Sequence, residues 1–300
     1  MLTTLQRSQN TREYERGSQQ KKHGLSTWMI ARRLLLYLLL IAGAIIMLSP
    51  FAYMLGLSFT PNSYTLPSPA DFMPAHPTLA NYVSAWTDNN FGQAFFNSVI
   101  VACGATFLTV LLASTLAFAF ARYRFPGRHI LFYGMLATMT VPGMVLIIPQ
   151  FVLASRLGLT NNRLGLILVY GAGLAFGVYL LRGFFEEIPQ ELFDAAAIDG
   201  CGIFRTFWSI ALPLARPALA AVTIFSFAAN WEEFTWAITS TNDASLYTLP
   251  VAIQQYYSAH GTDWGIVFAA SVLAILPEIL IFLIFQRQFV SGIRAGGLKG

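Results

Sequence analysis

The sequence predicts an all-α, polytopic membrane protein with six transmembrane helices. Of its 300 residues, 56% are hydrophobic and 11% are charged, whereas charged residues make up about a quarter of ordinary soluble domains. The apolar residues gather in runs of about twenty residues, the length that an α-helix needs to cross a bilayer. Lys and Arg gather in alternate connections between these runs. These three observations leave little chain for a separate soluble domain.

The first 33 residues form a polar arm, and the remainder, 34–300, forms one transmembrane domain. The first apolar run, 34–59, is too long and too far from the N-terminus for the core of a signal peptide, so it predicts a retained span. The next connection, 60–91, contains five prolines and no Lys or Arg. We expect it to be an extended loop on the outer side.

Three further runs follow at 95–121, 130–153 and 164–185. Arginines close the first of them on its C-terminal side. The second contains Pro142 and Pro149, which predicts a kink and a cavity where the freed carbonyls find partners. The third contains glycines at intervals, which allow helices to pack closely.

A more polar segment, 186–216, separates these runs from the next, and we call it the dock loop. Pro189 suits the start of a short helix and Gly200 its end. A second short helix is expected to end near Leu212, because Pro213 cannot continue it. The first helix has a face of mostly small side chains that a partner protein can approach closely, formed by Phe193, Ala196, Ala197 and Gly200.

The last two apolar runs lie at 217–238 and 265–285. Of the 18 Lys and Arg residues, 16 fall in the arm, the connection after the second run, the dock loop with the residues before it, and the C-terminal tail. The other two, Arg156 and Arg163, fall on the opposite side. The positive-inside rule therefore predicts cytoplasmic N- and C-termini and a cytoplasmic dock loop, in a multi-pass protein of the inner or plasma membrane.

Two partners are conceivable for the dock loop. A bent amphipathic hairpin can lie on lipid headgroups. However, acidic residues outnumber basic ones in this loop, which suits an anionic lipid surface poorly. A cytoplasmic protein partner is favoured.

Patterns typical of enzymes are missing from the sequence. It has no Walker A sequence, CxxC, HExxH or GxSxG, and its four histidines fall in the arm or in connections at unrelated positions. Basic residues are not interleaved with aromatic ones on one surface, as nucleic-acid binding would favour. We expect no catalytic residue, no metal or cofactor on this chain, and no nucleic-acid partner.

The fifth run carries a polar stripe that we interpret as part of a substrate path. An acidic residue within a span faces a cavity or a partner, and aromatic rings beside hydroxyl-binding groups suit a sugar. The alternative is that Asn230 and Glu233 only bond neighbouring helices; Glu278 in the sixth run is open to the same two interpretations. The polar residues fall within about 80° of one helix face, with two rings beside them: Thr223, Ser226, Asn230 and Glu233, then Phe227 and Phe234.

The dock loop also resembles a known motif. Asp194-Ala195-Ala196, then Gly200, then Ile210-Ala211-Leu212-Pro213 are similar in spacing to the EAA loop of permease subunits in binding-protein-dependent ABC importers. Asp194 stands where that family usually has Glu. Further matches resemble the carbohydrate branch, of the second maltose-permease type: 77–82, Asn97-Ser98 at the start of the second run, 231–234 and 289–300. Glu232 departs from the Asn usual in that branch.

The resemblance implies the type I ABC importer permease fold and a set of partners. These are a homologous second permease subunit, two ATP-binding subunits that hold ATP and Mg, and an extracytoplasmic solute-binding protein. The substrate would be a carbohydrate, such as a di- or oligosaccharide. An ion-coupled secondary transporter that uses intramembrane carboxylates is the alternative function. The residues implied to couple the chain to the ATPase are Asp194, Ala195, Ala196, Asp199, Gly200, Ile210, Leu212 and Pro213.

Overall fold

The computed structural model describes the backbone of residues 27–61, 63–66, 68, 73–256 and 262–297, and the side chains of all these except 27, 89 and 289–297. The described residues form helices and no strands, which confirms the all-α fold class for this part of the chain. Contacts group the chain into two units, Met1–Tyr53 and Met54–Gly300, which we describe separately.

The first span corresponds to helix α2, Thr27–Ser58, which continues through Pro50. Its apolar part, Trp28–Ser58, is long enough to cross a membrane. The helix begins before residue 34 because apolar residues extend the run to the N-terminal side of an arginine pair. The end of the expected polar arm is therefore helical, and the rest of the arm lies outside the described residues.

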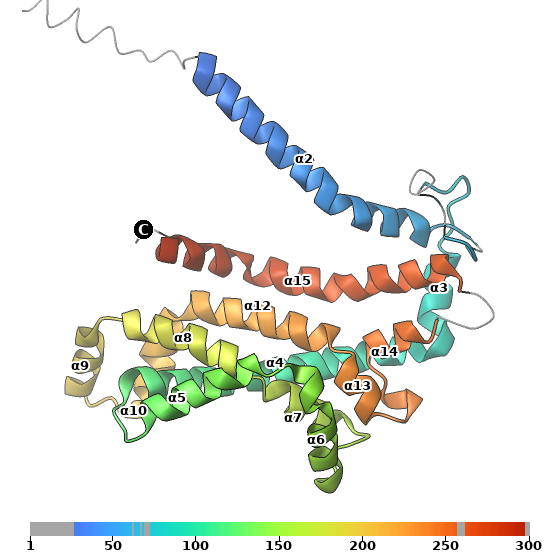
Figure 1. The fold of residues 1–300 in the computed structure, drawn as a ribbon. Coiled ribbons are helices and arrows are strands. Elements are labelled where there is room, and N and C mark those ends of the chain that lie inside the picture. The colour runs from blue at the N-terminus through green and yellow to red at the C-terminus, as the bar shows by residue number, and fades with distance from the viewer. Residues whose placement is uncertain (1–26, 62, 67, 69–72, 257–261, 298–300) are drawn as a thin grey trace, which may run out of the picture. The chain divides into compact units, whose positions relative to one another are not determined.

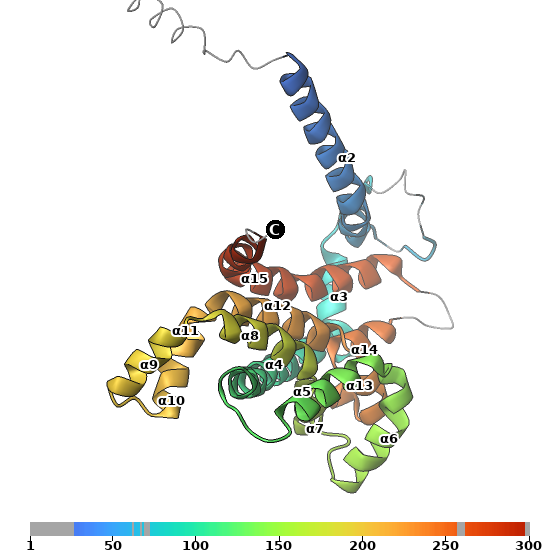
Figure 2. The same cartoon turned by 60° about the vertical axis from the view of Figure 1, so that its left-hand side comes forward.

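Two long unbroken helices run through the second unit (Figure 1): α4, Phe91–Arg122, and α15, Trp264–Gly297. Both contain a stretch long and apolar enough to cross a membrane. Helix α12 contacts both of them, so it lies between α4 and α15 (Figures 1 and 2). The helices that α4 contacts most are α7 (Arg163–Gly171), α8 (Ala175–Glu187) and α12 (Arg216–Glu232).

The third and fourth expected spans are each broken into two helices. We expected a kink at Pro142, and instead the helices on its two sides meet at 108°. The break is complete because Pro142 itself is extended, with a ψ of 129°. In the fourth span, α7 and α8 meet at 46°. The third span consists of α5 (Arg128–Ala137), the 3-10 turn η3 (Thr138–Thr140) and α6 (Gly143–Arg156).

Glycines bring the fourth span close to α4, as the sequence predicts. A Cβ added at Gly171 would lie 2.7 Å from the Leu108 side chain, and one at Gly177 would lie 2.9 Å from the Cβ of Ala113. The hydroxyl of Thr109 donates to the Gly171 carbonyl at 3.3 Å. Larger side chains would therefore separate these helices.

The fifth expected span, 217–238, is also interrupted. Helix α12 ends at Glu232, Glu233 is extended with a ψ of 115°, and α13 follows over Thr235–Ser240. By length and composition, the described residues give three unbroken helices and three bent pairs, or up to six membrane spans if each pair is one span; the third pair joins Ile203–Leu214 to α12 rather than α12 to α13.

The connection at 60–91 is not the extended loop that we expected. It contains helix α3, Ala80–Thr87, and the 3-10 turn η2, Asp88–Asn90. Prolines are confined to its first part, so nothing prevents a helix after Pro77. Asn81 fixes this helix by donating to the carbonyls of Ser58 and Thr60, at 2.9 and 2.8 Å.

Asn97 and Ser98 lie inside α4 rather than at the start of its span. The Asn97 amide donates to the carbonyls of Ser245 and Tyr247 at 2.8 and 3.0 Å. The Ser98 hydroxyl accepts from the Leu249 N–H at 2.7 Å. These bonds fasten to α4 the connection that contains η5 (Ala244–Leu246) and α14 (Leu249–Gln254).

Candidate functional site

The first short helix of the dock loop is α9, Gln190–Ile198, which lies with α10, Ile203–Thr206, at one end of the bundle (Figure 1). Gly200 has a φ of +72°, the left-handed conformation expected for the residue that ends this helix. The N–H groups of Gly200 and Cys201 donate to the carbonyls of Ala197 and Ala196, at 3.1 and 2.8 Å. The expected end of the first short helix is confirmed.

The second short helix ends at Leu214, close to the expected Leu212, but Pro213 lies inside it. It consists of α10 (Ile203–Thr206), the π-helical segment η4 (Phe207–Ala211) and α11 (Leu212–Leu214). The Leu212 N–H donates to the Phe207 carbonyl, five residues back. This wider turn changes the hydrogen-bond register just before Pro213, so the missing N–H and the ring of the proline are accommodated. A bend of 80° then leads into α12.

The small-residue face of α9 is covered by the chain itself only in part, because Ala196 is buried and Phe193 partly buried while Ala197 and Gly200 are exposed, so its approach by a partner stays a prediction. The ring of Phe193 lies 6.2 Å from that of Phe118 on α4, and Ala196 is buried. The four most exposed large apolar side chains of the loop are others, and we call them the apolar tip: Ile198, Ile203, Phe204 and Trp208, with exposed fractions of 86%, 59%, 82% and 57%.

The residues implied to couple the chain to an ATPase differ in their exposure. The carboxylate of Asp194 accepts from the side chain of Gln190 at 3.0 Å, one turn earlier in α9. Ala196 is the member of the set that is buried. The exposed members are Asp194, Ala195, Asp199, Gly200 and Pro213, and the partly buried ones are Ile210 and Leu212.

A cavity of about 930 Å³ lies where the broken spans meet. Its volume falls within the range of about 300 to 1,000 Å³ that is typical of small-molecule sites. Glu233 is the one charged residue among those that line it. The other polar lining residues are Thr109, Gln150, Ser226, Asn230 and Thr235, and the aromatic ones are Tyr170, Phe176, Phe225 and Trp236.

Ser226, Asn230 and Glu233 line this cavity together, as the polar stripe predicts. Asn230 also donates to the hydroxyl of Thr106 on α4 at 3.2 Å. Thr223 is not among the residues that line the cavity, and its hydroxyl donates to the Leu219 carbonyl one turn back in α12 at 2.8 Å.

Glu233 occupies the break between α12 and α13 and has three partners there. Its carboxylate accepts from the N–H of Trp236 at 2.8 Å and from that of Ala237 at 3.2 Å. The Tyr170 hydroxyl on α7 donates to it at 2.7 Å. The carboxylate therefore caps the start of α13 and bonds a neighbouring helix, which is the packing role that we considered as the alternative.

Phe227 and Phe234 do not lie beside the polar stripe. Phe227 is buried and stacks on Trp231, with ring centroids 5.6 Å apart. Phe234 lines a separate cavity of about 500 Å³, together with Glu232 and Glu278. The helical spacing fails at Phe234 because the helix has already ended.

Sequence reasoning missed the lining residues from other spans. Tyr170 and Phe176 flank the break in the fourth span, and Gln150 follows the break in the third. The breakers Pro142, Gly171 and Gly173 were the signal that could have found them, because irregular backbone within a membrane occurs where it lines a cavity or is buried in protein.

Comparisons with known proteins agree on the family. Residues 110–295 match the model of the binding-protein-dependent transport system inner membrane component. The chain is 38% identical over 264 residues to the diacetylchitobiose uptake system permease protein of Streptomyces coelicolor, covering 87% of each chain. It is 35% identical over 275 residues to the trehalose/maltose transport system permease protein of Thermococcus litoralis, covering 90% of this chain and 98% of that one.

The fold is also that of a solved transporter. A chain from a bacterial ABC transporter involved in the import of the acidic polysaccharide alginate matches with a TM-score of 0.76 and 22% identity, over 88% of this chain and 98% of that one. The family is a transport component rather than an enzyme, and neither it nor the relatives support an ion-coupled transporter. The chain belongs to the family of inner membrane components of binding-protein-dependent transport systems, as a permease of the ABC importer type.

Proposed function

We propose that this chain carries a carbohydrate, such as a di- or oligosaccharide, into the cell through the cavity between its broken spans. The composition of the cavity wall is the observation on which this proposal rests. Four aromatic rings can stack on the C–H faces of a sugar, and six polar side chains can meet its hydroxyls. The relatives named for diacetylchitobiose and for trehalose and maltose support the same class of solute.

The proposed importer needs partners both for the sugar path and for the dock loop. A homologous second permease subunit completes the path, and an extracytoplasmic solute-binding protein delivers the sugar. Two ATP-binding subunits hold ATP and Mg, and one of them receives the apolar tip. The exposed apolar side chains of the tip suit a groove on a soluble protein, because apolar contacts of this kind dominate interface energetics.

The proposed mechanism is alternating access, with the dock loop as a lever. Helix α11 ends at Leu214 and α12 begins at Arg216, so only Ala215 separates the two. Near the far end of α12 lie Asn230 and then Glu233, at the cavity wall. A tilt of the dock loop, caused by closure of the ATP-binding subunits, therefore moves one wall of the cavity directly.

Blocking the cavity tests the proposal. Ser226→Trp places a large ring among the lining residues, and Ser226→Ala is the matched control. In proteoliposomes with all partner subunits, we expect Ser226→Trp to lower uptake about tenfold or more by steric exclusion, with assembly and basal ATP hydrolysis retained. The probes are labelled diacetylchitobiose, maltose and trehalose. The cavity is not the path if Ser226→Trp assembles and transports at the wild-type rate.

The proposed orientation is tested by thiol labelling. Asn242 and Ser209 are exposed and lie in the connection after α13 and in the dock loop. In a background in which both natural cysteines, Cys103 and Cys201, are replaced by alanine, Asn242→Cys should react with an impermeant maleimide on intact cells. Ser209→Cys should react only after the membrane is opened. Equal labelling of both positions in intact cells would contradict cytoplasmic placement of the dock loop.

A further inference from the structure

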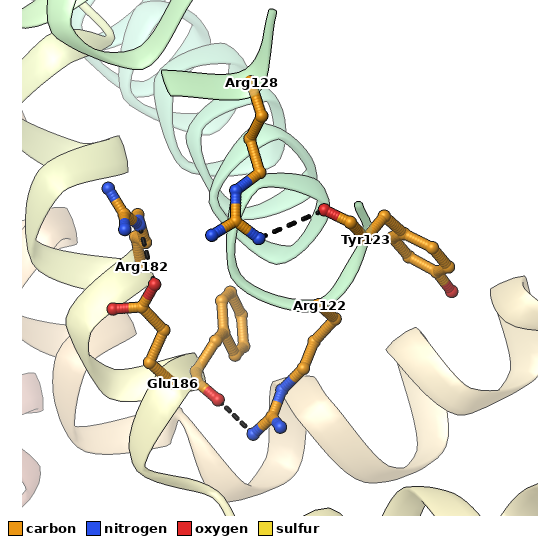
Figure 3. A network of polar contacts seen from close by, with 6 residues as sticks. Arg122, Tyr123, Arg128, Arg182 and Glu186 are labelled. Carbon is orange, nitrogen blue, oxygen red and sulfur yellow. Dashed lines mark hydrogen bonds and ion pairs between the residues drawn. The ribbon is translucent and has the colours of Figure 1, made fainter. Parts of the chain in front are cut away.

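The last residue of α4, Arg122, reaches into the start of the dock loop (Figure 3). Its guanidinium donates to the main-chain carbonyls of Phe185 and Ile188. It also donates to the side-chain carbonyl of Gln190 at 3.1 Å. Its central carbon lies 4.1 Å from the centre of the Phe193 ring, a cation–π contact.

These contacts join three helices at one point. Phe185 and Ile188 lie at the C-terminal end of α8, where carbonyls lack partners within the helix and favour a cation. Gln190 and Phe193 lie in the first turn of α9. Between them is Pro189, which has no N–H and contributes no backbone bond across the junction. The Arg122 side chain thus ties the end of α8 and the start of α9 to the end of α4.

Neighbouring arginines have different contacts. Arg182 on α8 pairs with Glu186 at 2.9 Å and lies over the Phe132 ring, with its central carbon 4.0 Å from the ring centre. Arg128 donates to the Tyr123 carbonyl at 3.3 Å (Figure 3). Neither of these two sets of contacts includes a residue of α9. Arg128 is therefore a matched control for Arg122.

A small cavity leaves room for movement at this junction. It measures about 230 Å³ and lies between the end of α4 and the dock loop, with Arg122, Phe193 and Ile203 among its lining residues. Tight packing would lock α9 onto α4, whereas a flexible, multiply bonded arginine next to open space holds the two together while it lets the angle between them change.

We propose that Arg122 is a positioning residue that transmits movement of the dock loop to α4. This inference rests on the proposed function and adds a second route to the one through α12. Helix α4 bears Thr109 at the cavity wall and Thr106 bonded to Asn230 of α12, so a tie between α4 and the dock loop connects the loop to the same wall from a second side. Arginine suits this role because its planar fork serves several acceptors and stacks on a ring at once, which lysine does not do.

The test is the number of sugar molecules transported per ATP hydrolysed by the full transporter in proteoliposomes. The sugar is whichever of diacetylchitobiose, maltose and trehalose the wild-type transporter takes up best. We expect Arg122→Gln to lower this ratio about tenfold, within the range of allosteric coupling energies, while the ATP-binding subunits still co-purify. The ratio for Arg122→Lys should lie between that of the wild type and that of Arg122→Gln, and the ratio for Arg128→Gln should match that of the wild type.

Other outcomes overturn the inference. A wild-type ratio in Arg122→Gln shows that the residue does not couple, and loss of the ATP-binding subunits shows that it only shapes the docking surface. If the Arg122 variants do not accumulate, Phe193→Leu removes the ring and keeps apolar volume; an unchanged ratio there overturns the inference as well. A wild-type transporter that takes up none of the three sugars would instead contradict the proposed function.

Discussion

Phe204→Asp is expected to release the ATP-binding subunit from the permease. Phe204 is the second most exposed member of the apolar tip, with an exposed fraction of 82%, so a charge there costs the isolated chain little. In a docked complex the same charge would be buried without a partner. Central aromatic residues of interfaces contribute about 2 to 4 kcal/mol, and the lower value already corresponds to about 30-fold weaker binding.

The measurement is co-purification of the ATP-binding subunits with the permease, followed by ATP hydrolysis in membranes. Phe204→Leu keeps an apolar side chain at the same position and should retain both. Insertion of the permease should be equal in the two variants, because neither alters a span. If Phe204→Asp binds the ATP-binding subunits as tightly as Phe204→Leu, the apolar tip is not the docking surface.

The sequence predicted the spans well because hydropathy is a local property. Each apolar run corresponds to one helix or to two successive helices, and Gly200 adopts the left-handed conformation. The breaks were less predictable. Prolines marked the position of the break at Pro142, but the 108° angle depends on the helices that pack around it.

Side-chain orientation was harder to predict than helix position. Spacing grouped Phe193 with Ala196 correctly, but it did not reveal that Phe193 packs on Phe118 of α4 while Phe204 on α10 stays exposed. The same limit applies to the cavity. Tyr170 reaches Glu233 from a segment 63 residues away in the sequence, a contact that no local pattern contains.

Glu233→Ala is expected to lower stability and remove uptake together. The substitution leaves the hydroxyl of the buried Tyr170 without its acceptor, along with the N–H groups of Trp236 and Ala237 at the start of α13. An unsatisfied buried polar group costs about 1 to 3 kcal/mol, so three of them exceed the effect of most single substitutions. The break between α12 and α13 would then lose its main support.

Glu233→Gln separates this positioning role from direct contact with the sugar. A glutamine keeps one carbonyl oxygen for the N–H groups of α13, and its amide can donate to the Tyr170 hydroxyl oxygen. We therefore expect Glu233→Gln to recover most of the thermal stability of the detergent-purified transporter and most of the uptake. Recovery of stability without uptake would indicate instead that the charged carboxylate contacts the solute. A Glu233→Ala transporter as stable as the wild type would show that the three hydrogen bonds do not hold the broken span, because their loss is the physical basis of the expected effect.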